Sequence, residues 1–283
     1  MRILKYAGLS LTAILLGVFV SVLVFLKTRI PPVSGEFAVE GLASTATITR
    51  DAYGVPHIQA SDADDAYFAL GYAQAQDRLF QMDFYRRAAR GELSEILGAE
   101  LLDADKYLRT LGFLRTARRQ YSGLSRETTA LVEAFSRGVN FFIRHGPMPL
   151  EFTLLGYGPR PWKAEDSIAI ANLLAFQLAS WAFTNETNLY LIQRRLGAEK
   201  AREFLPAYPE VFTPIIARGG PGGGRRAAIS PCSRRFIDGF LLRTIASNNW
   251  VIHGRRTESG KPLLGDDSHE DGPELPTQWH MAH

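Results

Sequence analysis

The longest uninterrupted hydrophobic run lies at the amino terminus of the chain. Residues 6–26, from Tyr6 to Leu26, carry no charged side chain, whereas basic residues stand on both sides of the run. Since about 20 apolar residues span a bilayer, the run predicts a membrane-spanning helix. Residues 1–30 are therefore expected to form a signal anchor or a signal peptide. The length favours an anchor that stays in the membrane, because a secretory signal has a shorter apolar core.

After this segment the pattern changes to apolar residues at helical spacing, which predicts a mainly helical region over residues 36–205. Ser61–Asp64 has the composition of a capping box and is expected to begin a helix that ends near Gly91. Asp83 and Arg87 stand four residues apart on this helix and are expected to pair. Further helices are expected from Ser125, from Glu165 to Ala182, and from Asn188 to Leu196.

A second kind of pattern, short runs of aromatic and β-branched residues, predicts strands. Near the end of the chain, Trp250–Ile252 and Pro262–Leu264 flank a stretch with the composition of a turn. This arrangement predicts a hairpin with Ser247 at its head, and His269 would return toward that serine. Earlier in the chain, short strands are expected at Ala46–Arg50 and Pro56–Ala60.

Composition and charge narrow the range of functions. The 283 residues are 46% hydrophobic, which is enough to bury a sizeable core. The formal net charge is only +3, and no basic stripe is interleaved with aromatic residues, so nucleic acid is not an expected partner. Cys232 is the only cysteine, which excludes a disulfide within the chain.

Residues 206–246 differ in composition from the helical region before them. The glycine-rich stretch Arg218–Arg226 predicts a flexible, exposed linker. Phe236–Leu242 is apolar enough to dock on the body of the protein. Residues 206–246 are therefore expected to be a linker whose carboxy-terminal end packs against the body of the protein.

Several motifs resemble those of one enzyme family. Ala246–Gly254, followed by Lys261–His269, resembles the start of the mature β chain in the penicillin acylase family of N-terminal nucleophile (Ntn) hydrolases. Arg50–Ile58 and Gly71–Asp83 resemble motifs of the α chain in the same family. The motifs occur in the family's order and together cover most of the chain after residue 46.

The resemblance implies a self-processing site at the hairpin. In the family the nucleophile is the first residue of its chain, so Ser247 would be the nucleophile and Ala246–Ser247 the cleaved bond. By the same match, His269 would support the amine or hydroxyl of the serine. Asn248 could orient the serine, although an asparagine at a strand start is also ordinary turn chemistry. The chain departs from the family at Ala246, commonly glycine, and at Ser268, commonly proline.

The resemblance also implies an α+β fold, with an Ntn-hydrolase αββα core that is incomplete here and a mainly helical α-chain region. Residues 206–246 would be a spacer that is removed after self-cleavage, and residues 247–283 the start of the β chain. Trp279–His283 looks like a third strand of the core sheet. The chain is therefore expected to be truncated and unable to complete the catalytic cycle by itself.

Two further sites are expected in the region around residue 185. Glu186 lies in a polar stretch whose oxygen atoms suit a hard cation such as calcium, but the stretch also suits a helix N-cap. Some family members bind calcium through a glutamate in this segment, so the resemblance implies a structural calcium ion at Glu186. Trp181 and Phe183 are candidates for lining an acyl pocket.

The expected function is that of an acylase precursor, a hydrolase of linear amides. Its substrate would be an acylated amine such as a penicillin or an N-acyl-homoserine lactone, and its α and β chains would come from one precursor. The catalytic part is expected outside the cytoplasmic membrane, either anchored to it and facing the periplasm or exported to the periplasm. The alternative is a non-catalytic, membrane-tethered helical module that binds an amphiphile or a partner, or a degenerate remnant.

Overall fold

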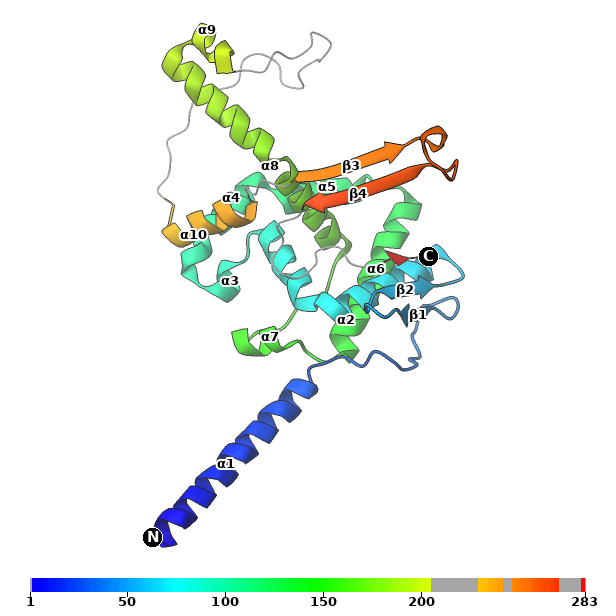
Figure 1. The fold of residues 1–283 in the computed structure, drawn as a ribbon, viewed down its shortest axis with the longest axis vertical. Helices are drawn as coiled ribbons and strands as arrows, with labels where there is room; N and C mark the ends of the chain where they lie inside the picture. Colours follow the sequence, from blue (N-terminus) through cyan, green and yellow to red (C-terminus); the bar gives the residue numbers. More distant parts are fainter. Residues whose placement is uncertain (1, 205–228, 242–245, 270–280, 283) are drawn as a thin grey trace.

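The computed structural model of the chain describes residues 2–204, 229–241, 246–269 and 281–282. Within these ranges a helical body carries short strands, and helix α1 extends away from the body (Figure 1). The α-helices are α1 (Arg2–Lys27), α2 (Ala63–Arg90), α3 (Ser94–Leu97), α4 (Leu102–Leu111), α5 (Phe113–Ser122), α6 (Arg126–His145), α7 (Leu150–Leu155), α8 (Ala164–Leu196), α9 (Ala198–Ala201) and α10 (Pro231–Phe236). The other helical segments are η1 (Ala99–Leu101), η2 (Arg202–Phe204), η4 (Gly254–Arg256) and the π-helical η3 (Ile237–Leu241). The strands are β1 (Thr47–Arg50), β2 (Pro56–Gln59), β3 (Ala246–Ile252), β4 (Leu263–His269) and β5 (Met281–Ala282).

Helix α2 begins and ends where the sequence predicts. The Asp62 carboxylate accepts a hydrogen bond from the backbone N–H of Asp65 at 2.8 Å, and Gly91 closes the other end with φ 63°. Both are standard helix caps, since the carboxylate satisfies a free N–H and glycine tolerates the left-handed conformation. Inside the helix, however, the backbone leaves helical geometry at Arg78, with φ −144° and ψ 22°. The predicted helix is therefore confirmed at its ends but consists of two segments joined at Arg78.

Helices α2 and α6 cross with their backbones in contact. A Cβ atom at Gly71 would lie 2.1 Å from the carbonyl oxygen of Phe135, and one at Gly138 would lie 1.9 Å from that of Phe68. No real side chain fits at such distances, because packed interiors leave no space for an extra carbon there. The crossing therefore depends on glycine in both helices.

Apolar side chains on the flanks of α2 form the core of the body. One cluster packs the carboxy-terminal half of α2 against α4, α5, α8 and η3 and buries Leu108 and Leu173 completely. Another packs the middle of α2 against α6 and α7 and buries Val139, Phe142 and Phe152. Burying such side chains contributes about 1.5–3 kcal/mol each. The helices expected from the apolar spacing thus pack against one another through two apolar clusters.

The strands lie in small sheets beside this body. Strands β1 and β2 form where the sequence predicts strands, and they pair antiparallel with Ile48 opposite Ile58. Strand β5 runs parallel to β2, with Met281 opposite His57. The expectation that Trp279–His283 is a third strand of the core sheet, beside the Ser247 hairpin, is wrong for the described residues 281–282. The free edge of β2 pairs with β5 instead, and β3 and β4 pair with each other.

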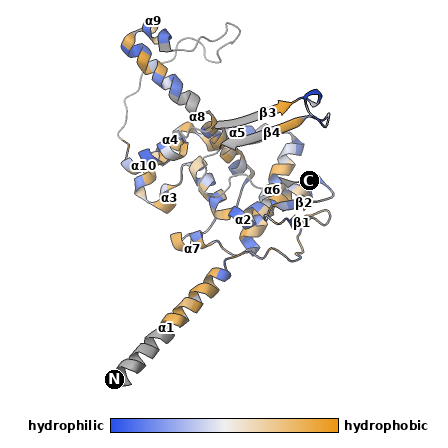
Figure 2. Ribbon diagram, in the orientation of Figure 1, coloured by the Kyte–Doolittle hydropathy of each residue, from blue (hydrophilic) through white to orange (hydrophobic). Residues whose placement is uncertain are grey.

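Helix α1 presents an apolar surface that the body leaves uncovered. From Ile14 onward its large apolar side chains are exposed, and Figure 2 shows the hydrophobic colour along this half of the helix. Ile14–Lys27 is an apolar helix shorter than a full span, and among the described residues no single helix is long and apolar enough to cross a membrane. The membrane segment predicted over residues 6–26 stays a prediction.

Helix α8 bends by 46° between the segments Ala164–Ser180 and Asn185–Leu196. Within the described ranges these two segments are the bent pair whose combined length and composition match a membrane span. The first segment also supplies core residues, including the completely buried Leu173. The sequence predicts separate helices ending at Ala182 and beginning at Asn188, whereas the structure continues the helix through the polar stretch and bends it.

Candidate active site

The hairpin that carries Ser247 forms as predicted. Strands β3 and β4 are antiparallel, with Ser247 opposite Ser268 and Ala246 opposite His269. The backbone of His269 therefore lies beside the bond between Ala246 and Ser247. The side chains of Ser247, Asn248 and His269 lie outside the part of the structure that is described, so their predicted roles stay predictions.

The far end of the hairpin is closed by a tight loop. Gly260 turns the chain with φ 69°, and its carbonyl oxygen would lie 2.3 Å from a Cβ atom at Gly254. The Nδ1 atom of His253 accepts a hydrogen bond from the backbone N–H of Arg255 at 3.1 Å. His253 is thus a loop-forming residue. Along the strands, Gly265 is opposite Trp250 and leaves room for the indole ring.

The segment ahead of the hairpin is docked on the body. Phe236 and Phe240 stack with ring centroids 4.7 Å apart, and both rings contact Phe84 of α2. The backbone carbonyl of Phe240 accepts a hydrogen bond from Gln177 Nε2 of α8 at 2.7 Å. The predicted docking of Phe236–Leu242 is confirmed for residues 236–241, whereas Leu242 lies outside the described residues. The chain is thereby fixed a few residues before Ala246.

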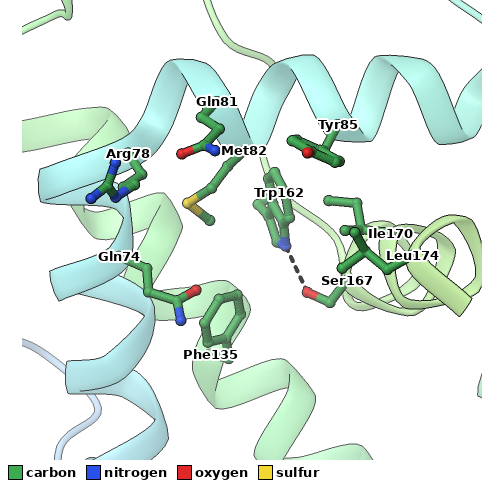
Figure 3. Close-up of a pocket in the computed structure, with 10 residues that line it drawn as sticks. All are labelled: Gln74, Arg78, Gln81, Met82, Tyr85, Phe135, Trp162, Ser167, Ile170 and Leu174. Carbon is green, nitrogen blue, oxygen red and sulfur yellow. Dashed lines mark hydrogen bonds between the residues drawn. The ribbon is translucent and has the colours of Figure 1, made fainter. Parts of the chain in front are cut away.

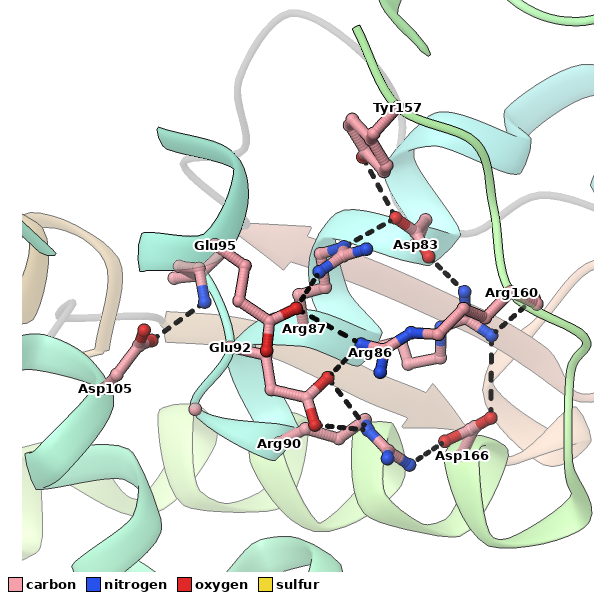
Figure 4. A network of polar contacts seen from close by, with 12 residues as sticks. Asp83, Arg86, Arg87, Arg90, Glu92, Glu95, Asp105, Tyr157, Arg160 and Asp166 are labelled. Atoms are coloured by element: carbon pink, nitrogen blue, oxygen red, sulfur yellow. Dashed lines mark hydrogen bonds and ion pairs between the residues drawn. The ribbon is translucent and has the colours of Figure 1, made fainter. Parts of the chain in front are cut away.

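A buried network of ion pairs surrounds Asp83, the last residue of the motif Gly71–Asp83 (Figure 4). The Asp83 carboxylate is fully buried, receives Arg87 Nε at 2.9 Å, and also pairs with Arg86. The Tyr157 hydroxyl donates to the same carboxylate at 2.9 Å, and burial together with the charge of Asp83 raises the pKa of this phenol well above its ordinary value. The predicted Asp83–Arg87 pair is confirmed, and its burial among packed helices indicates a structural role.

A pocket opens where α2 breaks, between α2, α6 and α8 (Figure 3). Its volume is about 160 Å³. The residues that line it are Gln74, Arg78, Gln81, Met82, Tyr85, Phe135, Trp162, Ser167, Ile170 and Leu174. Sequence reasoning missed this pocket because its wall comes from distant segments and because no glycine or proline marks the break at Arg78.

The metal and acyl sites expected around residue 185 stay predictions. Glu186 is exposed on α8. Across the ranges that the structure covers, no cluster of three or more His, Cys, Asp or Glu residues could hold a metal ion. Since calcium also binds backbone and asparagine oxygens, the calcium ion expected at Glu186 stays a prediction. Trp181 and Phe183 lie at the bend of α8, and their side chains lie outside the described residues.

Comparison with known proteins identifies the family. The penicillin amidase family model matches residues 45–283. The chain belongs to the penicillin amidase family. It is 35% identical over 271 residues to penicillin acylase 2 proenzyme of Pseudomonas sp. (strain SE83), a match that covers 91% of this chain and 34% of that protein. It is 34% identical over 262 residues to acyl-homoserine lactone acylase QuiP of Pseudomonas aeruginosa, covering 89% of this chain and 31% of that protein.

The chain also aligns in part with a solved structure. Thermostable penicillin G acylase from Alcaligenes faecalis aligns with a TM-score of 0.49 and 26% identity, over 64% of this chain and 98% of that chain. The chain spans about a third of the length of the curated relatives named above. The family-model match over residues 45–283 confirms the resemblance inferred from the motifs at the level of the family.

Proposed function

We propose that this protein is the precursor of a self-processing amidohydrolase whose nucleophile is Ser247. The observation that carries the proposal is the hairpin, in which the backbone of His269 lies beside the Ala246–Ser247 bond in a penicillin amidase family member. The docked segment before the hairpin adds support, because it fixes the chain on the amino-terminal side of this bond. A non-catalytic binding module would not need this arrangement.

The chemistry follows from the position of the serine. A serine hydroxyl is a weak nucleophile and needs a base to take its proton. Once Ser247 is the first residue of its chain, its own α-amine can act as that base, because an α-amino group has an ordinary pKa of about 7.7–8.0. Before cleavage the same nitrogen is an amide and cannot accept the proton. The uncut chain is therefore inactive toward substrates.

Self-cleavage activates the site in two steps. The Ser247 oxygen attacks the Ala246 carbonyl carbon, and the hydroxyl proton passes to the departing nitrogen as the C–N bond breaks, so that the acyl group moves from nitrogen to oxygen as an ester. Water then hydrolyses the ester, which leaves a carboxylate on Ala246 and a free amine on Ser247. His269, opposite Ala246 in the ladder, would assist by holding the new amine.

The mature enzyme would repeat the reaction on an external amide. Ser247 attacks the substrate carbonyl, the amine leaves with a proton, and water releases the carboxylic acid from the acyl-enzyme. The relatives' names, penicillin acylase and acyl-homoserine lactone acylase, support an acylated amine as the substrate class. The exposed apolar half of α1 supports a membrane anchor, and the location of the catalytic part outside the cytoplasmic membrane is proposed from the family resemblance.

The proposal is tested by looking for the new amino terminus. The whole gene product is expressed, and its fragments are examined by intact mass and amino-terminal sequencing. We expect one fragment to begin at Ser247 in the wild type and no cleavage in Ser247→Ala. Ser268→Ala is the matched control, since Ser268 is opposite Ser247 in the same hairpin, and it should still be cut. An uncut wild type, or equal cleavage in Ser247→Ala, would refute the proposal.

A further inference from the structure

The end of helix α1 is fixed to the body beside helix α7. The backbone N–H of Thr28 still donates to the Val24 carbonyl at 3.0 Å, so the helical turn continues past Lys27. The Cζ atom of Arg29 lies 4.7 Å from the centroid of the Phe25 ring, and Arg29 Nη1 donates to the backbone carbonyl of Met148 at 3.4 Å. Helix α7 begins two residues after this carbonyl. The exposed apolar half of α1 therefore ends next to α7.

The segment that follows α1 is held on the body as well. Gln76 Nε2 of α2 donates to the backbone carbonyl of Pro32 at 2.7 Å. Helix α1 is thus joined to the body by contacts within a few residues of its end. Figure 1 shows α7 and the carboxy-terminal end of α6 on the side of the body from which α1 extends. Any surface that α1 enters is therefore within reach of α7.

Helix α7 carries apolar side chains on the face that points away from the body. Phe152 is completely buried, with its ring centroid 5.5 Å from that of Phe80. Two positions later, and therefore about 200° round the helix, Leu154 is 75% exposed. Leu155 beside it is 39% exposed. Exposed apolar side chains that lie together mark an interaction surface.

Basic side chains flank these leucines. Lys27 lies in the last turn of α1 and Arg144 in the last turn of α6, and both are exposed. Ile30, which follows α1, is 69% exposed. The exposed Glu151 of α7 offsets part of the positive charge. Apolar groups beside basic groups suit the surface of an anionic bilayer, where the apolar groups enter the boundary of the acyl chains and the cations meet phosphates.

We propose that Lys27, Arg144, Leu154 and Leu155 form a juxtamembrane face that rests on the anionic phospholipid surface into which α1 inserts. A lipid surface is the occupant that the structure favours, because the exposed apolar helix α1 ends beside this face. The body would then be held against the membrane in one orientation, with the β3–β4 loop directed away from it. The inference rests on the proposed function only for the membrane anchor.

Contact with lipid is measured by fluorescence quenching on the Ser247→Ala form of the whole gene product. Cys232 is replaced by serine, and a fluorescent label is attached to Leu154→Cys. The protein is reconstituted in vesicles of phosphatidylcholine and phosphatidylglycerol whose acyl chains carry bromine, a contact quencher. We expect the label to lose fluorescence relative to vesicles without bromine. Ser259→Cys is the matched control, because its loop between β3 and β4 lies far from α1 in Figure 1, and its label should keep its fluorescence.

A change of charge tests the electrostatic part of the contact. Each basic residue near an anionic membrane surface contributes about a fivefold factor to binding. Arg144→Gln should therefore lower the ratio of quenched to unquenched Leu154 label about fivefold. Arg255→Gln, at an exposed position in the β3–β4 loop, is its control and should leave the ratio unchanged. Unchanged quenching in Arg144→Gln would overturn the role given to the basic residues.

A label on α1 separates this inference from the proposed anchor. Phe19→Cys, at an exposed position of α1, reports whether the helix lies in the bilayer. Quenching at Phe19→Cys without quenching at Leu154→Cys would overturn the juxtamembrane face and leave the anchor standing, whereas no quenching at either site would refute both. A Leu154 label that lipid does not quench, but whose emission shifts with protein concentration in detergent, would assign the face to a second copy of the chain and also overturn the inference. Cleavage at Ser247 plays no part in the measurement, so failure of self-processing would be seen separately.

Discussion

The close crossing of α2 and α6 gives a quantitative prediction for Gly138→Ala. The added Cβ atom would lie 1.9 Å from the Phe68 carbonyl oxygen and 2.8 Å from the Tyr72 backbone nitrogen. Both neighbours are backbone atoms of a helix, so neither can rotate away as a flexible side chain could. The helices would have to separate by about 1 Å or more to restore an ordinary contact.

The expected loss of stability combines two opposing effects. Overpacking a well-packed core typically costs about 1–3 kcal/mol, and a clash with backbone belongs at the upper end of this range. Alanine is intrinsically favoured over glycine inside a helix by about 1 kcal/mol, which offsets part of the cost. The net destabilisation should therefore be about 2 kcal/mol. At about 2–4 °C per kcal/mol, the thermal midpoint should fall by about 4–8 °C.

Thermal unfolding followed by circular dichroism measures this shift directly. Gly158→Ala is the matched control, because a Cβ atom at Gly158 meets nothing within 4 Å. Surface substitutions of this kind change stability by about 0.5 kcal/mol or less, so its midpoint should stay within about 2 °C of the wild type. A Gly138→Ala midpoint equal to that of Gly158→Ala would refute the close crossing as a source of stability.

Three further predictions concern the body and the docked segment. Asp83→Asn removes the buried carboxylate that Arg86 and Arg87 share, and leaves them, among the described ion pairs, only Asp166 at 3.6 Å and the half-exposed Glu95. This change should cost about 3–5 kcal/mol in urea unfolding, whereas Arg137→Gln at an exposed pair should cost little. Burial opposes ionisation of Asp65, but hydrogen bonds from Ala43 and Ser44 outweigh burial and lower the pKa of this carboxyl below its ordinary 3.8. The ionised carboxylate therefore stabilises the fold above pH 3.8, and this stabilisation is lost as the pH falls through the folded-state pKa. Asp65→Asn should therefore flatten the acid side of the stability–pH curve, and an unchanged slope would contradict this assignment. Phe240→Ala should make residues 231–241 sensitive to limited proteolysis, while Arg235→Ala at an exposed position should not.

Local sequence signals account for much of the fold. The ends of α2 follow from the Asp62 cap and the Gly91 stop, and the Ser247 hairpin follows from apolar strands flanking a glycine turn. Each of these features depends on residues close together in the chain, which is why the pattern predicts it. The family assignment rests on the same kind of evidence, since its motifs are short and contiguous.

The errors arise where distant segments decide the structure. Strand β5 pairs with β2 because of an edge formed more than two hundred residues earlier, which no local pattern near Met281 reveals. The polar stretch around Glu186 has the composition of a helix start, yet the helix passes through it and bends. Likewise, the pocket wall joins residues of three helices, so periodicity predicts each helix and not the space between them.

The break at Arg78 is the clearest difference between the helix that the sequence predicts and the helix α2 that is observed. Every residue around it, in Gln76-Asp77-Arg78-Leu79, is compatible with a continuous helix, and neither glycine nor proline is present to cause a kink. A departure from helical geometry without a local cause must be maintained by interactions elsewhere in the fold, and such departures gather at binding and catalytic sites. At this position the departure coincides with a pocket and with two buried atoms, Arg78 Nε and Gln81 Oε1, that have no hydrogen-bond partner among the described residues. Helix α2 packs against α6 and α8 on either side of the break, and this long-range packing, which the sequence pattern near Arg78 does not contain, is therefore the physical reason we give for the broken helix.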